Sequence, residues 1–411
     1  MSTAPPFSLS PPPTWDVCPF GRIVNRSQES GRPEARSLSV FIDQGVVPRD
    51  SRDDNFNRLG ADLAKYLVVR KGDIVFNRLR TWQGGLGVSK FDGIVSPAYF
   101  VCRPQANSEP RYMHYLLRSH LYLKELTRIS KWMPPSQFDI AWDDLRSLNV
   151  LVPSFDTQSL IANYLDWETG RIDEVVSARR RMIGLLEERA VAFIEDSAFN
   201  AGWRTVMLGR VIRHIEQGWS PQCDARPPTE NEWGVLKVGC VNHGEFRRDE
   251  AKALPAGIAP RPEYLVRSGD FLMSRANTRD LVGSAAVAYR VRSQTLLCDK
   301  LYRLRLDKSQ VTSRFVALWL QTRAARDQIE LEATGASDSM QNIGQDTVRR
   351  VVIPLPDLHR QEAFVVRCER ERVHIGKLIG SIRTQIDLLQ ERRQALITAA
   401  VTGRLEIPDA A

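Results

Sequence analysis

The period of hydrophobic and polar positions changes along the chain, and the same changes occur twice. Short runs at 73–76 and 270–273 follow a Gly-Asp turn and hold β-branched or aromatic side chains, which predicts strands. Segments 111–126 and 314–329 carry apolar residues at helical spacing, and each predicts one helix. Strand-like runs that end in proline close both mixed regions.

Two long stretches without proline follow, at 158–200 and 361–403. Their apolar residues fall at heptad spacing, which predicts two long helices packed on each other as a coiled coil. Arg179 and Arg392–Arg393 interrupt the stripe, and packing of each helix on its own globular domain is the alternative. The predicted helix-packing residues are Ile172, Val176, Ile183, Leu186, Phe193, Ile375, Ile379, Ile382, Ile386, Leu389 and Leu396.

Three pairs of matching segments indicate an internal repeat. WDVCPFGRIV from Trp15 matches WRTVMLGRVI from Trp203, and YLVVRKGDIVFNR from Tyr66 matches YLVRSGDFLMSR from Tyr264. PSFDTQSLIANYL matches PDLHRQEAFVV further along each half. The offsets are 188, 197 and 203 residues in this order. Short apolar segments can match by chance, but the shared order of the three pairs and the small change in their offset favour two homologous halves.

The repeat divides the 411 residues into two copies of one plan. We expect an α+β fold in which two pseudo-repeated α/β domains are separated by the two long helices. The expected segments are a flexible proline-rich tail at 1–14, a mixed domain at 15–150, a helix at 151–202, a second mixed domain at 203–350, and a second helix with a C-terminal tail at 351–411.

The charge distribution suggests where a polyanion would bind. The chain carries a net charge of +8, whereas segments 158–200 and 361–403 carry −3 and +2. The remaining residues therefore carry +9. A nucleic-acid surface would need its positive charge in these mixed domains.

The sequence contains no convincing catalytic apparatus. It has no GxxxxGK[ST] phosphate loop, no HExxH motif and no CxxC pair, and its histidines are dispersed. These observations predict a binding protein with no catalytic residue, no metal site and no cofactor of its own. Scattered cysteines, no visible secretory signal and no apolar run of roughly 18 residues predict a cytoplasmic protein without a membrane span.

The binding candidates lie directly after the Gly-Asp strands. Residues 77–83 contain two arginines, two carboxamides and a tryptophan, and 274–279 occupy the equivalent place. Arginine can hydrogen-bond guanine, Asn and Gln can bond adenine, and Ser and Thr can hold phosphate. A solvated turn with Trp82 in the core is the alternative, and the further loops at 131–133 and 335–342 fit turn chemistry equally well. The candidate DNA-binding residues are Asn77, Arg78, Arg80, Trp82, Gln83, Lys131, Ser274, Arg275, Asn277, Thr278, Arg279, Ser337, Gln341 and Asn342.

The chain resembles the specificity subunit of type I restriction-modification systems over nearly its whole length. PLPDLHRQ at 354–361 and LLQERRQALITAAVTGRLEI at 388–407 carry most of the resemblance, together with the loop segments YLVVRKGDIVFNRLRTWQGGLGVS and LMSRANTRDLVGSAAV. The first copy of the helical segment, LLEERAVAFIEDSAF, is a degraded version that lacks the AVTG ending at 400–403.

This resemblance implies that each mixed domain recognises one half of a bipartite site in double-stranded DNA, and that the helices pack antiparallel as a spacer. It also implies two modification subunits that methylate adenine with S-adenosylmethionine. Restriction subunits with ATP and Mg would add translocation and cleavage.

Two other functions stay open from the residues alone. A coiled-coil scaffold could bridge proteins without recognising DNA, although the +9 surplus argues against it. A fused nuclease or methyltransferase with unrecognised motifs is the other. The missing GxxxxGK[ST] loop weighs against it, as do Pro134-Pro135 and Pro227-Pro228, which lack the Asn or Asp before and the aromatic residue after that an amino-methyltransferase uses to hold an exocyclic amine.

Overall fold

The computed structural model describes residues 11–42, 44–51, 60, 62–133, 137–199, 202–337 and 340–407. The chain forms two compact units: unit 1 is Met1–Arg179 with Arg383–Ala411, and unit 2 is Arg180–Ile382. Each unit contains one sheet-rich domain and one part of each long helix, α4 (Phe155–Phe199) and α8 (Leu358–Val401). The predicted α+β class with two sheet-rich domains and two long helices is confirmed. Residues 1–10 of the predicted tail lie outside the described residues.

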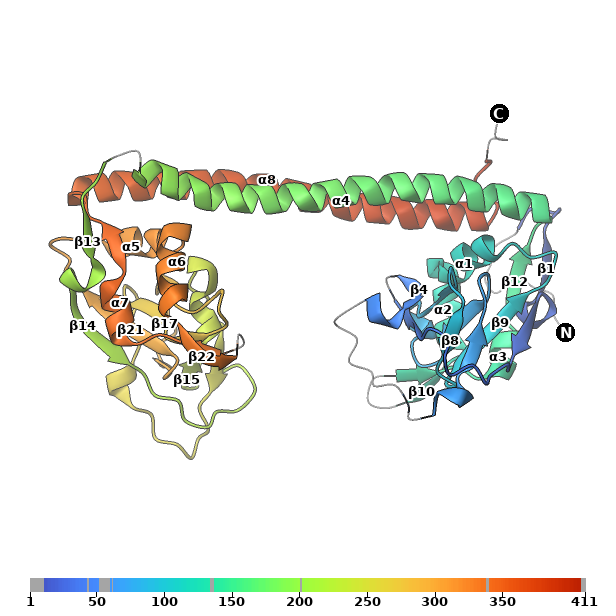
Figure 1. Cartoon of the computed structure of the whole chain (residues 1–411), viewed down its shortest axis with the longest axis horizontal. Helices are drawn as coiled ribbons and strands as arrows, with labels where there is room; N and C mark the ends of the chain where they lie inside the picture. The colour runs from blue at the N-terminus through green and yellow to red at the C-terminus, as the bar shows by residue number, and fades with distance from the viewer. Residues whose placement is uncertain are drawn as a thin grey trace. The chain divides into compact units, whose positions relative to one another are not determined.

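Both units contain a four-stranded antiparallel sheet with the same strand order (Figure 1). In unit 1 the order is β2 (Val24–Ser27), β9 (Tyr99–Pro104), β6 (Ile74–Asn77) and β7 (Leu86–Val88). In unit 2 it is β14 (Ile212–Gln217), β21 (Leu301–Leu306), β17 (Phe271–Ser274) and β19 (Ala285–Val287). The Gly-Asp strands β6 and β17 therefore hold the same inner position of equivalent sheets.

A second pairing recurs where each domain meets its long helix. Strand β1 (Asp16–Pro19) pairs with β12 (Asn149–Val152), and β13 (Thr205–Met207) pairs with β24 (Val352–Pro354). A Cβ added to Gly21 would lie 3.0 Å from the Cβ of Arg146, which precedes β12. A Cβ added to Gly209 would lie 3.0 Å from the Cβ of Arg349, which precedes β24. The close approach explains why glycine recurs in the first matching segment.

The units differ in their smaller sheets. Unit 1 adds β3 (Leu38–Phe41) with β4 (Gly45–Pro48) and β5 (Leu67–Val69) with β8 (Gly93–Val95), whereas unit 2 adds β16 (Ala251–Ala253), β15 (Gly234–Leu236) and β20 (Thr295–Leu296) in one sheet. The short 3₁₀ helices are η1 (Phe20–Arg22), η2 (Arg49–Ser51), η3 (Leu63–Lys65), η4 (Thr81–Gln83), η5 (Leu208–Arg210), η6 (Val238–Gly244) and η7 (Pro262–Tyr264).

The prediction of a single helix over 111–126 and over 314–329 is wrong, because two consecutive helices occupy each of these segments. They are α1 (Pro110–Arg118) and α2 (His120–Arg128) in unit 1, and α5 (Ser313–Trp319) and α6 (Arg323–Glu332) in unit 2. Ser119 and Thr322 stand before the second helix of each pair in extended conformation, and their hydroxyl oxygens accept the N–H groups of Tyr122 and Ala325. A side-chain N-cap begins a new helix although the apolar spacing continues. The shorter helices α3 (Trp142–Arg146) and α7 (Gln345–Arg350) precede β12 and β24.

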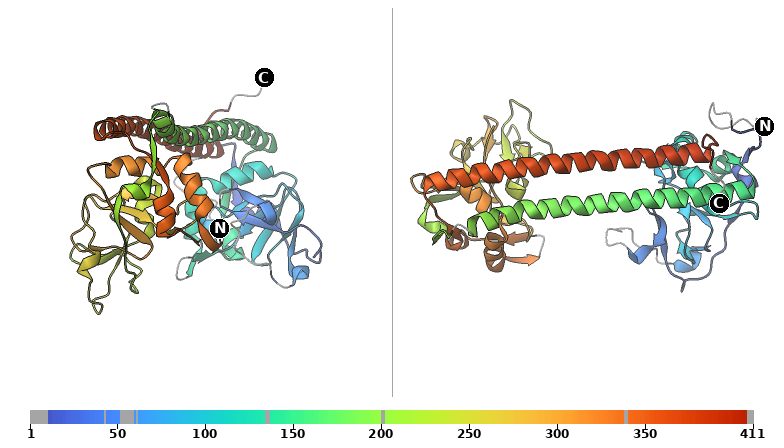
Figure 2. Two further views of the ribbon diagram at one scale, coloured as in Figure 1. Left: turned by 60° about the vertical axis from the view of Figure 1, so that its left-hand side comes forward. Right: turned by 90° about the horizontal axis from the view of Figure 1, so that it is seen from above.

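The two long helices lie side by side and antiparallel within each unit (Figure 2). In unit 1 an oxygen of Asp173 lies 3.3 Å from Nε of Arg393, so a residue that interrupts the apolar stripe forms an interhelical ion pair. In unit 2 the Arg189–Glu371 contact is 3.7 Å long, and the Arg367 guanidinium lies 5.1 Å from the Phe193 ring centre. Among the predicted packing residues, Ile172, Val176, Ile375, Ile382 and Ile386 are buried, and Ile183, Leu186, Phe193, Ile379, Leu389 and Leu396 are half-buried.

A buried glutamine near the start of each long helix ties the helix to its own domain. The Gln158 amide donates to the carbonyls of Pro153 and Asn107, and its oxygen accepts the Glu109 N–H. The same three bonds recur in unit 2, where Gln361 donates to Pro356 and Gln310 and accepts from Thr312. The hydrophobic core of each unit likewise includes residues of the sheet, the paired short helices and the long helices.

Candidate nucleic-acid interface

The Gly-Asp turn that begins β6 and β17 has one geometry in both units. Gly72 and Gly269 have φ of 95° and 96°, in the left-handed region that favours glycine. A carboxylate oxygen of Asp73 accepts the Arg70 N–H at 2.9 Å, and Asp270 accepts from the N–H three residues before it at 2.9 Å. Both aspartates are buried, and burial raises the pKa of Asp73. The turn fixes where each following strand, and hence its loop, begins.

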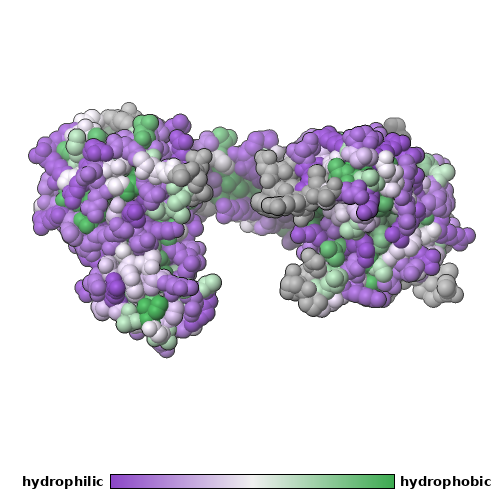
Figure 3. Space-filling view, turned by 60° about the horizontal axis from the view of Figure 1, so that its bottom comes forward, coloured by the Kyte–Doolittle hydropathy of each residue, from purple (hydrophilic) through white to green (hydrophobic). Residues whose placement is uncertain are grey.

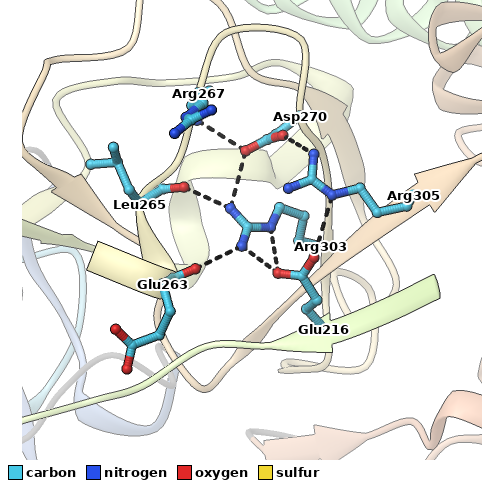
Figure 4. Close-up of polar contacts among 7 residues, drawn as sticks. All are labelled: Glu216, Glu263, Leu265, Arg267, Asp270, Arg303 and Arg305. Atoms are coloured by element: carbon cyan, nitrogen blue, oxygen red, sulfur yellow. Dashed lines mark hydrogen bonds and ion pairs between the residues drawn. The ribbon is translucent and has the colours of Figure 1, made fainter. Parts of the chain in front are cut away.

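A buried arginine holds this turn in unit 2 (Figure 4). The Arg303 side chain, 4% exposed, lies between the carboxylates of Glu216 and Asp270 and donates to the Leu265 carbonyl at 2.6 Å. The Arg305 guanidinium contacts the same two carboxylates at 3.3 and 2.8 Å. Because a buried guanidinium is stable only when paired and hydrogen-bonded, this network specifies how β14, β21 and the turn fit together.

Unit 1 carries a simpler version of the network. The Arg103 guanidinium donates to Glu29 at 2.6 Å and lies 3.6 Å from Asp73. Arg70 also donates to Glu29 at 3.0 Å. These hydrogen bonds from Arg103 and Arg70 lower the pKa of Glu29. The turn aspartate therefore contacts an arginine of the adjacent strand in both units, but by strand register Arg103 is equivalent to Arg305, and Val101 stands at the position of the buried Arg303.

The loop after β6 presents some of its predicted residues outward and engages others. Arg80 and Gln83 are exposed, whereas the Asn77 amide lies 3.3 Å from the Tyr99 hydroxyl. The Arg78 guanidinium donates to Asp139 at 2.6 Å. The Trp82 indole is half-buried, and its N–H donates to the Leu79 carbonyl at 3.2 Å. Trp82 is thus only partly packed in the core, and the other part of its side chain is exposed to solvent.

A short hairpin lies against this loop in unit 1. It consists of β10 (Lys131–Met133) and β11 (Gln137–Asp139), and Lys131 is exposed. The Phe138 ring centre lies 5.0 Å from that of Trp82 and 4.9 Å from that of Trp132. Together with the Arg78–Asp139 ion pair, these contacts bring two candidate loops far apart in sequence into one surface.

The equivalent loop of unit 2 is more polar. Ser274 is fully buried, and its hydroxyl donates to the Leu281 carbonyl, so this candidate does not reach the surface. The Arg275 guanidinium donates to the Asp299 carbonyl at 3.3 Å, and Asn277 donates to the Asn242 side chain at 3.0 Å. The remaining candidates of the 274–279 loop, Thr278 and Arg279, are exposed.

The hairpin of unit 2 extends this polar loop. It consists of β22 (Thr334–Ser337) and β23 (Met340–Asn342), and β23 also pairs with β18 (Ala276–Asn277). Gln341 and Asn342 are half-buried on β23, while the side chain of Ser337 lies outside the described residues. The loop and the hairpin are therefore brought together in each unit.

The hairpins contribute residues that the sequence did not predict. Phe138 and Asp139 hold the unit 1 hairpin against its loop, and Asn242 faces Asn277 in unit 2. A signal for the hairpins was present, because the offset of 203 residues aligns KWMPPSQFDI with TGASDSMQNI and ends on the buried pair Ile140 and Ile343. Asn242 has no such signal, since it comes from the part of unit 2 that differs from unit 1.

The face of the chain in Figure 3 is mostly hydrophilic, with small scattered hydrophobic patches. The described residues bring together no group of three or more histidine, cysteine, aspartate or glutamate side chains that could hold a metal. Within the described part of the chain, no helix is long and apolar enough to cross a membrane.

Comparisons with known proteins identify relatives of one kind. No model of a protein family matches the chain. Over 205 residues, or 50% of this chain, it is 35% identical to the specificity subunit of the type I restriction enzyme EcoEI from Escherichia coli. The chain spans only 34% of that relative. It is 20% identical over 322 residues to the StySPI specificity subunit from Salmonella potsdam, covering 74% of this chain and 67% of the relative.

A solved structure supports the fold. A chain from a study of assembly and conformational transition in the type I R-M system matches with a TM-score of 0.69 and 19% identity, over 97% of this chain and 100% of that one. The sequence resemblance is thus confirmed: the chain is a homologue of type I restriction enzyme specificity subunits.

Proposed function

We propose that the chain is the DNA-binding specificity subunit of a type I restriction-modification complex, and that each unit recognises one half of a bipartite double-stranded DNA site. The observation that carries the proposal is the contrast between repeated framework and divergent loops. The Gly-Asp turn, the contact of its aspartate with an arginine of the adjacent strand, and the helix glutamine recur in both units. The loops on this framework carry different side chains at matching positions, which suits two different half-sites.

In this proposal residues 15–150 and 203–350 are the target-recognition domains, and 151–202 and 351–411 are the helical arms. The +9 surplus outside the long helical segments supplies the electrostatic attraction to DNA. The proposed DNA contacts are Asn77, Arg78, Arg80, Trp82, Gln83, Lys131, Arg275, Asn277, Thr278, Arg279, Gln341 and Asn342. The long helices set the spacing between the half-sites.

The helices also offer a docking surface for partner subunits. Exposed apolar side chains on α4 include Trp167 and Leu185, at 58% and 65% exposure, and those on α8 include Val373 and Leu388, at 60% and 58%. Exposed apolar side chains repeated along helices are typical of protein contacts. We assign this surface to two modification subunits, one for each copy of the repeat.

The chemistry of the complex lies on the partners. The modification subunits supply S-adenosylmethionine-dependent methylation of adenine, and restriction subunits supply ATP- and Mg-dependent cleavage. The present chain is proposed to catalyse no step. The cysteines are free, which supports a reducing, cytoplasmic location.

Sequencing genomic methylation in cells that carry the chain with its partner subunits tests the proposal. The expected result is one bipartite methylated-adenine motif that disappears when the chain is deleted. Absent or salt-insensitive DNA binding would favour the scaffold, and methylation by the purified chain with S-adenosylmethionine would favour the enzyme.

A further inference from the structure

We propose that the unit 1 hairpin β10–β11 binds DNA by inserting Trp132 against the bases, whereas unit 2 contacts its half-site without an aromatic insertion. This inference rests on the proposed function and adds a mode of contact that differs between the two half-sites. Insertion of apolar side chains between base steps is a known way to grip and bend a duplex.

The unit 1 hairpin exposes an aromatic side chain on an ordered strand. Trp132 is 53% exposed on the face that it shares with Phe138, and Met133, which is 44% exposed, follows it on the opposite face of the strand. The Trp132 ring packs edge-on against Phe138, whose other neighbour is Trp82. The indole N–H of Trp82 is itself bonded to a backbone carbonyl. Trp132 is therefore held by Phe138, which is itself held by Trp82, so Trp132 loses little conformational freedom when a base stacks on it.

The segments that carry Trp82 and Trp132 are positively charged. Segments 77–83 and 131–133 contain Arg78, Arg80 and Lys131 and no acidic residue. Arg80 and Lys131 are exposed, while Arg78 is paired with Asp139 and lies 5.3 Å from the Phe100 ring centre. Cations beside exposed aromatic rings match the phosphate and base surfaces of a nucleic acid. This combination favours DNA over an apolar protein surface as the occupant.

The unit 2 hairpin carries no aromatic ring at these positions, although Met340 on β23 is 43% exposed. At the offset of 203 residues, Trp132 corresponds to Gly335 and Phe138 to Gln341. A Cβ at Gly335 would lie 2.2 Å from the Met340 carbonyl oxygen, so the unit 2 hairpin has no space for a side chain there. Gln341 stands opposite Asn277 in the strand register, which places amide groups where unit 1 has rings. The two hairpins therefore occupy equivalent positions, but only the unit 1 hairpin carries aromatic rings there.

The test uses the full-length chain and a duplex that the wild-type chain selects from a randomised pool. Trp132→Ala should weaken binding about tenfold to a hundredfold, since stacking on one ring is worth that much. The slope of log K against log salt should not change, whereas Lys131→Ala should reduce its magnitude by about one phosphate contact. With 2-aminopurine placed at successive steps, fluorescence should rise in one half-site only, and the rise should vanish in Trp132→Ala.

The matched control is Phe91→Ala, because Phe91 is 37% exposed and follows β7 at the end of the sheet that carries the Gly-Asp turn, away from the loop and the hairpin. It should leave DNA affinity unchanged, and Trp132→Phe should restore most of the fluorescence signal if stacking matters. Equal affinity and fluorescence for the wild type and Trp132→Ala would overturn the inference while leaving the proposed function intact. Loss of modification-subunit retention alone would make the hairpin a protein contact and also overturn it. A chain that selects no duplex would overturn the proposed function itself.

Discussion

Replacing Gln361 by alanine should weaken the attachment of α8 to unit 2 without disturbing unit 1. The Gln361 side chain is fully buried and satisfies three backbone groups, the carbonyls of Pro356 and Gln310 and the N–H of Thr312, at 2.8–2.9 Å. Alanine would leave all three without this partner inside the protein.

The magnitude follows from the number of groups left unpaired. Each buried group without a partner costs about 1–3 kcal/mol, and water that enters the vacated space offsets part of that cost. We therefore expect the free energy of unfolding of unit 2 to fall by about 3 kcal/mol. Gln385→Ala is the matched control, because Gln385 lies on the exposed side of α8 and should change stability by less than about 0.5 kcal/mol.

Hydrogen exchange followed by mass spectrometry is the suitable assay, because a chain with two units need not unfold in one step. Gln361→Ala should accelerate exchange in peptides around 310–318 and 352–365 and leave peptides of unit 1 protected. Gln158→Ala should produce the mirror result in unit 1. The reasoning is refuted if Gln361→Ala behaves like Gln385→Ala, or if exchange rises equally in both units.

Three further predictions concern the loops, the helices and one histidine. Arg78→Ala with Arg80→Ala should relax methylation specificity in one half-site, and Arg275→Ala with Arg279→Ala in the other; equal loss in both halves would contradict direct recognition. Adding one heptad to both long helices lengthens each by about 10 Å, or about three base pairs, and should change the spacer length between the two halves of the methylated site. An unchanged spacer length would refute the proposal that the helices set the spacing. Burial lowers the pKa of His114 to about 3, so its stabilising contribution is present above about pH 6.5 and is lost as pH falls. Unit 1 should lose about 1–2 kcal/mol between pH 7 and 5, and His114→Gln should abolish that slope in thermal unfolding; an unchanged slope would assign it to other groups.

The repeated anchors could be predicted because their chemistry is local in sequence. Gly72 and Asp73 form their turn with a residue three positions earlier, and Gln158 bonds a carbonyl five positions earlier. The heptad positions also report directly on burial along a helix. Such features leave short sequence motifs, and these motifs allow the two halves to be aligned.

The remaining features depend on contacts between distant segments. Arg103 and Glu29 are 74 residues apart, so no spacing rule connects them. Helical periodicity continues across Ser119, and the new helix is shown by the extended backbone of Ser119 and by the hydrogen bond that its oxygen accepts from the Tyr122 N–H. Ser274 follows the loop pattern in sequence, yet its hydroxyl is used inside the unit.

The distribution of these contacts explains how one scaffold can serve two half-sites. The repeated groups, such as Asp270 and Gln361, are buried and bond to backbone atoms or to each other, so most substitutions there would leave a polar group unpaired. Arg80, Gln83 and Arg279 project from the same framework into solvent, where substitution costs little stability. Loop chemistry can therefore change without changing the position from which it is presented, and the replacement of Trp132 by Gly335 at the matching hairpin position illustrates how far that change extends between the two units.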